Sequence, residues 1–202
     1  MLNLFLQLAL TFVIAYLIGA IPTGYIIVKT KTGDDIRKIG SGSTGATNVK
    51  RVLGKKWFFI TLLLDALKGA TPVILAKIFV TVGQTIGIAP VLASIAVIIG
   101  HSKSCFLGFQ GGKSVASGVG TILALNWLVG LSIAGIWAVI TYFTKYVSVG
   151  SIIALLISPF LMFFFKAPLA YVCSCALGAI YIVYLHRENI KRLIAGNENK
   201  VR

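Results

Sequence analysis

The chain has 202 residues, of which 57% are apolar and only 12% are charged, and its mean hydropathy is +0.94. A soluble domain is about half apolar and about a quarter charged, so this composition excludes an ordinary soluble globular protein. It also excludes a disordered chain, which requires low hydrophobicity. The sequence therefore predicts an all-α, polytopic membrane helical bundle that forms a single domain over residues 1–202.

Residues 1–28 contain no charged side chain, and about 20 apolar residues are enough to cross a bilayer core. The segment is not typical of a signal peptide, because no Lys or Arg precedes it and its apolar run is too long. Basic residues follow it instead, at Lys29, Lys31, Arg37 and Lys38. The positive-inside rule then places the N-terminus outside and residues 29–56 in the cytoplasm.

Two features interrupt the first two apolar segments. Pro22 lies between Gly19 and Gly24, which predicts a kink that lines a polar cleft. Asp65 and Lys68 lie three residues apart inside the second segment, where charged side chains are costly and are expected to pair within the bundle. The sequence leaves open whether this pair is purely structural or supports a functional site.

The number of spans depends on one long apolar segment. Apolar segments cover residues 57–80, 85–101, 114–144, 149–165 and 168–185. The segment 114–144 is either one span or two short spans broken near Asn126, which gives six or seven helices in total. With seven, the tail from His186 is cytoplasmic, and so are all 19 Lys and Arg residues except Lys68, Lys77 and Lys166. We therefore predict seven transmembrane helices, with a short or tilted fourth, an external N-terminus and a cytoplasmic C-terminus.

This placement also explains the formal net charge of +14, which would suggest nucleic-acid binding in a soluble protein. Basic residues gather on the side where membrane insertion and anionic lipid favour them. We therefore expect membrane lipid, and no nucleic acid, among the partners.

The first of three polar motifs on this side covers residues 39–56. Its glycines permit tight turns from which several N–H groups converge on an anion; they are Gly40, Gly42 and Gly45. Hydroxyl and amide side chains accompany them at Ser41, Ser43, Thr47 and Asn48. Arg51 can bind a phosphate through two parallel hydrogen bonds. The alternative interpretation is a flexible Gly/Ser linker.

The second motif, residues 100–114, contains Gly-Lys-Ser. A nucleotide-binding P-loop would need glycine at position 107, which is leucine, and a preceding strand, so we exclude it. We expect Gly111, Gly112 and Lys113 to open the fourth helix, where unpaired N–H groups favour an anion. Lys113 is alternatively a lysine at the membrane boundary, and His101 is as readily structural as catalytic.

The third motif covers residues 186–198. If it is helical, one face carries His186, Asn189 and either Arg192 or Lys191. The alternative is a basic helix on anionic lipid, which fits His186, Asn189 and Glu198 less well.

Anion-binding loops, cations and a membrane bundle indicate a phosphorylated substrate at the cytoplasmic leaflet. The residues alone do not separate an enzyme of lipid phosphates, including a phosphatase, from an anion or phosphorylated-precursor transporter. A transporter is expected to show an internal repeat or paired broken helices at the bilayer midplane. The sequence has no such repeat, and its polar motifs gather at one surface, which favours an enzyme.

Residues 40–51, Gly100-His101 with 108–113, and 186–193 resemble the three motifs of the PlsY family, the integral-membrane acyl-phosphate:glycerol-3-phosphate acyltransferases of bacteria. The resemblance implies seven transmembrane helices in the cytoplasmic (inner) membrane. It implies acyl transfer from acyl-phosphate to glycerol 3-phosphate, giving lysophosphatidate and phosphate, the first step of phospholipid synthesis. It implies no cofactor and no metal. It leaves open whether the chain docks the enzyme that produces acyl-phosphate.

The resemblance also assigns the site. The implied catalytic residues are Ser41, Arg51, Lys113, His186 and Asn189. The implied substrate-binding residues are Gly40, Gly42, Ser43, Thr47, Asn48, His101, Gly111, Gly112 and Glu198. The sequence departs from the family at Ser43-Thr44, where asparagine and a small apolar residue are common, and this affects at most one substrate hydrogen bond.

The three cysteines, Cys105, Cys173 and Cys175, lack zinc-type spacing and are expected to pack as small apolar residues. None lies beside an activating base, so we expect direct acyl transfer without an acyl-enzyme. The proton of the attacking hydroxyl then goes to the phosphate of glycerol 3-phosphate or to His186.

Overall fold

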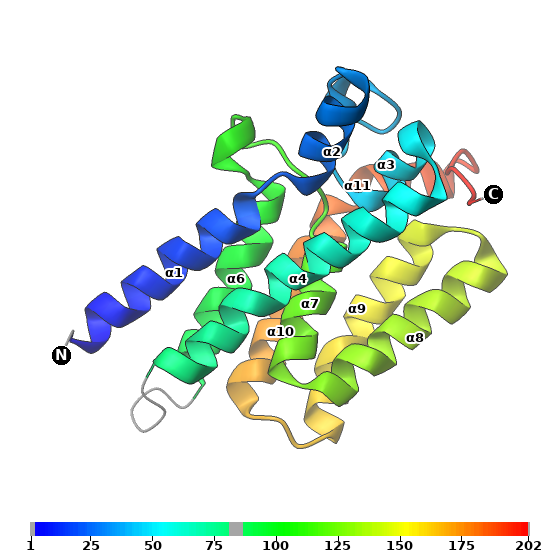
Figure 1. The fold of residues 1–202 in the computed structure, drawn as a ribbon. Helices are drawn as coiled ribbons and strands as arrows, with labels where there is room; N and C mark the ends of the chain where they lie inside the picture. Colours follow the sequence, from blue (N-terminus) through cyan, green and yellow to red (C-terminus); the bar gives the residue numbers. More distant parts are fainter. Residues whose placement is uncertain (1–2, 81–86, 202) are drawn as a thin grey trace. The chain divides into compact units, whose positions relative to one another are not determined.

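The computed structural model describes residues 3–80 and 87–201, and every regular element in these ranges is a helix (Figure 1). The predicted external Met1, the start of the segment 85–101 and the basic Arg202 lie outside the described residues. The expected all-α fold is confirmed. The helices group into two compact units, one up to Thr121 and one from Ile122, which are described in turn. A single domain for the whole chain stays a prediction.

The first unit contains two long apolar helices, several short ones and two polar loops. Its elements are α1 (Leu4–Ala20), α2 (Thr23–Thr32), η1 (Ile36–Lys38), α3 (Ala46–Leu53), α4 (Lys55–Phe79), α6 (Ile88–Ser102), η2 (Cys105–Leu107) and α7 (Val115–Leu125). The helix α7 runs past Thr121 into the second unit.

The first apolar segment breaks where the sequence predicted a kink. The helix α1 ends at Ala20 and α2 begins at Thr23, with Ile21 and Pro22 between them. Proline has no N–H to continue the helix and its ring displaces the preceding turn. The carbonyl of Ile21 lies at this break between the helices, where it accepts from the N–H of Thr23 at 3.0 Å and from the ammonium of Lys68 at 2.7 Å.

Glycines allow the helices of this unit to cross closely. A Cβ on Gly100 of α6 would collide with the backbone of α1 at Tyr16, and one on Gly69 of α4 would collide with the backbone of α7 at Ser117. Small residues let membrane helices approach until their backbones touch. These crossings bring the polar residues of α4, α6 and α7 together.

A small apolar core holds α2, η1 and α3 together. It consists of Ile27, Val28, Ile36 and Val49, and Trp57 at the start of α4 packs against it. We call residues 23–53 the cap. This core fixes the ends of the glycine-rich loop that contains the first motif, so the loop is not a free linker.

The second unit contains α8 (Trp127–Thr144), α9 (Val147–Phe164), α10 (Leu169–Leu185) and α11 (Arg187–Ile194). Asn126 separates α7 from α8, and its Oδ1 accepts hydrogen bonds from the N–H groups of Leu128 and Val129 at 3.1 and 3.3 Å. Asparagine is a preferred N-cap for this reason. The predicted break near Asn126 is confirmed.

In the part of the chain that the structure describes, four helical segments are long and apolar enough to cross a membrane: Leu4–Thr32, Lys55–Phe79, Trp127–Thr144 and Val147–Phe164. A fifth arises if α10 and α11, which meet at 58°, count as one bent span. The helices α6 and α7 are shorter, and the 11 residues of α7 rise about 17 Å against a core of about 30 Å. A short fourth helix is thus confirmed, whereas the seven-span topology stays a prediction.

Candidate active site

The side chain of Asn48 organises the loop of the first motif, residues 39–45. Asn48 is 1% exposed. Its Nδ2 donates to the carbonyl oxygens of Ile39 and Ser43, both at 2.9 Å, and its Oδ1 accepts from the N–H of Ser41 at 3.1 Å. Both ends of the amide are engaged by the loop itself. Asn48, predicted as a substrate ligand, therefore holds the loop in shape.

The glycines of this loop serve its turns. Gly40 and Gly42 adopt φ of 62° and 69°, in the left-handed region that side chains disfavour. The N–H of Gly42 donates to Ile39 O at 3.1 Å, and that of Gly45 to Ser43 Oγ at 3.4 Å. With the Ser41 N–H bound to Asn48, these three N–H groups are already bonded within the loop. Anion binding by the loop stays a prediction.

Arg51 differs from the other arginines near the motifs. Arg37 is bound to Asp35 at 2.6 Å and Arg192 to Glu198 at 2.8 Å, and Arg187 lies 3.9 Å from Glu188. Arg51 is exposed on α3, and among residues 3–80 and 87–201 it has neither a hydrogen-bond partner nor a carboxylate. A guanidinium without a counter-charge is suited to binding a phosphate.

The stem of Arg51 passes the exposed part of the loop. A Cβ added to Gly40 would lie 3.6 Å from Arg51 Cδ. Ser41, the next residue, is exposed, whereas Ser43 and Thr47 are half-buried. The structure thus brings Gly40, Ser41 and Arg51 together around the buried amide of Asn48.

The second motif folds back onto the end of α6. The N–H of Gly112 donates to His101 O at 3.1 Å, and a Cβ on Gly112 would collide with Nε2 of the His101 ring. A Cβ on Gly111 would collide with His101 O. We call residues 108–114 the Lys113 loop; Gly111 and Gly112 are required because the loop packs directly on His101 at these two positions.

The start of α7 corrects one prediction. The helix begins at Val115, two residues beyond Lys113, and Ser114 precedes it with φ of 59°. The Ser114 Oγ donates to Ile98 O at 2.8 Å. Gly111, Gly112 and Lys113 therefore lie ahead of the helix rather than in its first turn, and the Gly112 N–H is already bonded.

Three polar contacts tie the intervening turn, residues 103–107, to other elements of the first unit. Ser104 Oγ donates to Ala20 O at 2.6 Å, and Tyr16 Oη donates to Lys103 O at 2.8 Å. Arg37 Nη1 donates to Leu107 O at 3.4 Å, which joins the cap to this turn. Hydrogen bonds from Arg37 also lower the pKa of Asp35 to about 2, so Asp35 stays ionised and holds Arg37.

The third motif lies in the second unit and is closed by Glu198. Its Oε1 accepts from Asn189 Nδ2 at 2.6 Å and from Ser148 Oγ at 3.0 Å, and its Oε2 accepts from Arg192 Nε at 2.8 Å. Glu198 was predicted to bind substrate. Its carboxylate, with a side chain 6% exposed, fastens the C-terminal segment to α11 and α9. A contact between Glu198 and substrate stays a prediction.

His186 is buried at the bend between α10 and α11. Its Nδ1 lies 2.8 Å from Ile182 O, and because a carbonyl can only accept, Nδ1 carries the hydrogen. In the neutral imidazole Nε2 is then the acceptor nitrogen. The expected helical third motif is confirmed, with His186 and Asn189 both buried.

The model of the glycerol-3-phosphate acyltransferase family matches residues 9–196. The chain belongs to this family. This acyltransferase is 45% identical to the glycerol-3-phosphate acyltransferase of Nostoc sp. (strain PCC 7120), over 93% of this chain and 89% of that protein. It is 39% identical to the one from Acholeplasma laidlawii, over 97% of this chain and 94% of that protein.

Two solved structures of PlsY, an integral membrane glycerol 3-phosphate acyltransferase, have the same fold as this acyltransferase. The glycerol 3-phosphate form has a TM-score of 0.89 and 36% identity, covering 96% of both chains. The lysophosphatidic acid form has a TM-score of 0.87 and 35% identity, covering 96% of this chain and 95% of that one. The resemblance drawn from the three motifs is confirmed: the chain is a multi-pass membrane acyltransferase for glycerol 3-phosphate.

Several supporting residues of the acyltransferase escaped the sequence analysis. They are Tyr16, Arg37 and Ser104, which bond the turn 103–107 to other elements, and Ser117, which joins α7 to His101 of α6. Tyr16, Arg37 and Ser104 bond to backbone carbonyls, which every residue has. No pattern of residue types in the sequence therefore predicts these contacts. A buried hydroxyl in an apolar helix is the one available signal, and it applies to Ser117, which is 0% exposed.

The Glu198 contacts predict a stability that depends on pH. Burial alone raises the pKa of Glu198, but hydrogen bonds from Asn189, Arg192 and Ser148 outweigh it and lower the pKa below its ordinary value of 4.5. Because the folded-state pKa is lowered, the stabilisation is complete above the unfolded-state pKa and is lost as the pH falls through the folded-state pKa. Glu198→Gln is expected to cost about 1–2 kcal/mol at pH 7, since Arg192 is partly exposed and screened.

Thermal unfolding in detergent, followed by tryptophan fluorescence, measures this effect. The difference in Tm between the wild type and Glu198→Gln is expected at pH 7 and to shrink below pH 4.5. The matched control is Glu188→Gln, which removes an exposed carboxylate on α11 and is expected to change Tm little. Equal effects of the two variants at pH 7 would contradict the assigned role of Glu198.

Proposed function

We propose that this acyltransferase uses acyl-phosphate as its donor and forms 1-acyl-glycerol 3-phosphate and inorganic phosphate. The observation that carries the proposal is the pairing of the arginines within residues 3–80 and 87–201. Of the four arginines near the motifs, Arg51, beside the exposed Ser41, is the one without a carboxylate partner in these ranges. Both substrates are phosphorylated, and a cation of this kind suits their phosphates.

The chemistry requires little covalent participation by the protein. An acyl-phosphate is a mixed anhydride, so its carbonyl carbon is already activated and phosphate is a competent leaving group. The hydroxyl oxygen of glycerol 3-phosphate attacks that carbon, the carbon–oxygen bond to phosphate breaks, and the hydroxyl proton passes to a base. The enzyme holds two anions together and stabilises the oxyanion, for which cations and N–H groups suffice.

Ser41, Arg51 and Lys113 are our proposed substrate-binding residues in the first unit, and His186 and Asn189 in the second. The base is either the phosphate of glycerol 3-phosphate, with a second pKa of about 6 by analogy with phosphoserine, or Nε2 of His186. The tautomer set by Ile182 O supports the second alternative.

Purified protein in lipid, given palmitoyl-phosphate and glycerol 3-phosphate, tests the donor. Lysophosphatidate and phosphate are expected in equal amounts. Parallel reactions with palmitoyl-CoA and with palmitoyl-acyl carrier protein are expected to give none. Product from either thioester, with none from palmitoyl-phosphate, would overturn the proposed donor and leave the family assignment intact.

We further propose that the protein lies in the bacterial inner membrane with its N-terminus outside and Glu198 in the cytoplasm. The distribution of Lys and Arg supports this orientation. Reporter fusions after Glu198 are expected to be active only as cytoplasmic reporters. An external C-terminal reporter would contradict the seven-span topology.

Direct transfer without an acyl-enzyme is the next expectation. The described cysteines are free thiols, of which Cys175 is buried. Ser117 Oγ lies 2.9 Å from His101 Nδ1, which resembles part of a catalytic triad, but Asp65 approaches the same nitrogen at 3.8 Å. In a triad the serine and the carboxylate occupy opposite nitrogens of the ring, and Ser117 is 0% exposed. This arrangement therefore does not activate a nucleophile.

The protein with all three cysteines replaced by serine is expected to retain activity within a few-fold of the wild type. Incubation with acyl-phosphate alone is expected to leave the protein mass unchanged. An acylated serine or cysteine that glycerol 3-phosphate discharges at the rate of turnover would refute direct transfer.

A further inference from the structure

Two buried charges in α4 form an ion pair that reaches a histidine on α6. Asp65 Oδ1 lies 2.8 Å from Lys68 Nζ and 3.8 Å from His101 Nδ1. The side chains of the three residues are between 2% and 8% exposed. Charged side chains are costly in an apolar span and mark functional positions more often than structural ones.

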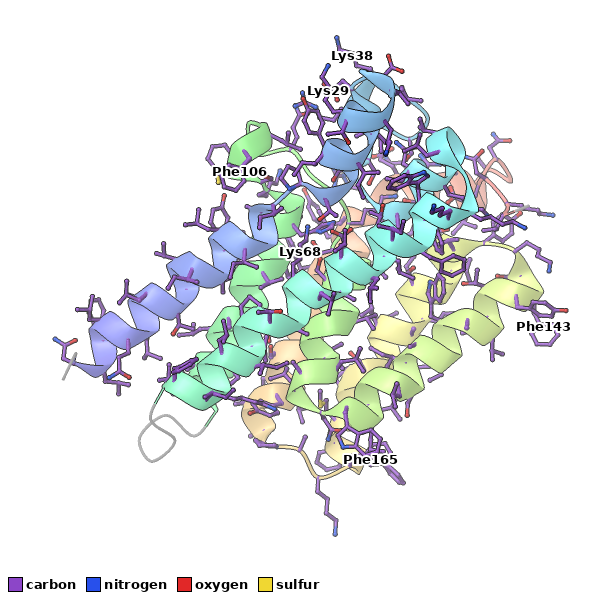
Figure 2. The ribbon with its side chains drawn as sticks, in the orientation of Figure 1. Lys29, Lys38, Lys68, Phe106, Phe143 and Phe165 are labelled. Carbon is purple, nitrogen blue, oxygen red and sulfur yellow. The ribbon has the colours of Figure 1, made fainter. Side chains whose placement is uncertain are left out.

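This ion pair connects four helices of the first unit. Lys68 Nζ donates to Ile21 O at 2.7 Å, at the break between α1 and α2 where the cap begins. Ser117 Oγ on α7 lies 2.9 Å from His101 Nδ1 on α6. Figure 2 shows Lys68 where α4 lies next to the end of α1 and to α6. The pair and its two neighbours thus form one buried polar network.

The network ends at the Lys113 loop. The His101 ring lies against Gly112 so closely that a Cβ there would collide with it, and His101 O accepts the Gly112 N–H. On the other side of the ring, Ser117 Oγ lies within hydrogen-bond distance of Nδ1, at 2.9 Å, and the Asp65 carboxylate lies 3.8 Å from the same nitrogen. The position of the loop backbone beside Lys113 therefore depends on Ser117 and Asp65, through their contacts with His101.

Stability alone does not account for this arrangement. A buried ion pair is often no more stabilising than apolar side chains of similar volume, because both charges lose their hydration. This pair has a geometric consequence as well. Lys68 bonds the Ile21 carbonyl at the start of the cap, and Asp65 lies near His101, on which the Lys113 loop packs. Both the cap and the Lys113 loop are therefore positioned relative to α4.

We propose that Asp65 and Lys68, acting through His101 and Ser117, are positioning residues that fix the Lys113 loop for binding the phosphate of glycerol 3-phosphate. The inference rests on the proposed role of this loop in substrate binding. None of the four residues needs to touch the substrate; loosening the network is expected to weaken binding of glycerol 3-phosphate and to leave the acyl donor site unchanged.

Two variants loosen the network without leaving a lone buried charge. Ser117→Ala removes the hydroxyl beside His101, and the double variant Asp65→Asn/Lys68→Met removes both charges together. The matched controls are Ser94→Ala, which removes a buried hydroxyl bonded only within α6, and Lys77→Met, which removes another lysine of α4. Size-exclusion chromatography in detergent reports whether each variant is folded.

The measurement is the Kd of glycerol 3-phosphate for the purified protein in detergent, which needs no acyl donor. Ser117→Ala is expected to raise the Kd about threefold to tenfold, as for loss of one buried hydrogen bond, and the double variant at least tenfold. Both controls are expected to stay within about twofold of the wild type. In the acyl-transfer reaction with palmitoyl-phosphate, the KM for glycerol 3-phosphate is expected to rise in parallel with the Kd. The kcat and the KM for palmitoyl-phosphate are expected to stay nearly unchanged.

An unchanged Kd in both variants would overturn the proposal. An equal rise in Kd in both variants and in the control Ser94→Ala would also overturn it, because it would indicate general destabilisation. If the double variant does not fold, Ser117→Ala decides alone. Wild-type protein that binds glycerol 3-phosphate but ignores palmitoyl-phosphate would defeat the proposed donor without affecting this test.

Discussion

Arg51→Ala is expected to lower kcat/KM for glycerol 3-phosphate about a hundredfold, in a protein that still inserts and folds. A hydrogen bond to a charged group is worth about 1.5–3 kcal/mol, or about tenfold to a hundredfold, and loss of orientation adds to that figure. The Arg51 guanidinium forms no ion pair with a carboxylate among the described residues, so its removal leaves no buried charge unpaired. Folding is therefore expected to survive.

The matched substitutions distinguish contact from charge. Arg51→Lys is expected to remain poor, because an ammonium does not reproduce the planar pair of donors. Lys56→Ala removes an exposed positive charge five residues away and is expected to retain activity. Lys113→Ala is expected to behave like Arg51→Ala. Near-normal turnover in both alanine variants would mean that these cations serve only membrane orientation.

Gly112→Ala is expected to raise KM for glycerol 3-phosphate by tenfold or more. The added methyl would collide with Nε2 of His101 and lie 3.0 Å from its Cδ2. The ring has no room to yield, because His101 is 7% exposed and Ser117 holds it at 2.9 Å. The loop must move instead, and over-packing of this kind costs about 1–3 kcal/mol.

Steady-state kinetics with varied glycerol 3-phosphate measure this effect. Gly135→Ala, on α8, is the control, because a methyl there meets nothing within 4 Å. It is expected to leave both kinetic constants unchanged. A Gly112→Ala enzyme with wild-type KM would show that the Lys113 loop tolerates displacement and does not bind the substrate.

The parts of the fold that the sequence predicted depend on local chemistry. Pro22 ends a helix because it lacks an N–H, Asn126 starts one because its side chain reaches the next N–H groups, and Asp65 and Lys68 pair because they lie one turn apart. Each feature involves residues within four positions of one another. No packing information is needed to foresee them.

The parts that the sequence did not predict depend on packing between distant residues. In the sequence, Glu198 is one of several polar residues in the third motif. Its role in the structure depends on Ser148, which lies 50 positions away and donates to its carboxylate. Arg37 and Leu107 are separated by 70 positions. Composition likewise shows that Asn48 and the loop glycines are able to bind a phosphate, but it does not show that Asn48 bonds the loop backbone.

The uncompensated charge of Arg51 has a consequence for the resting enzyme. A cation without a fixed counter-charge attracts mobile anions from solution, and salt screens that attraction. Binding of glycerol 3-phosphate is then an exchange with whichever anion is present. Inorganic phosphate, which the proposed reaction would release, is expected to compete for the same guanidinium. We then expect the rate of acylation to depend on the ratio of glycerol 3-phosphate to free phosphate rather than on the concentration of substrate alone.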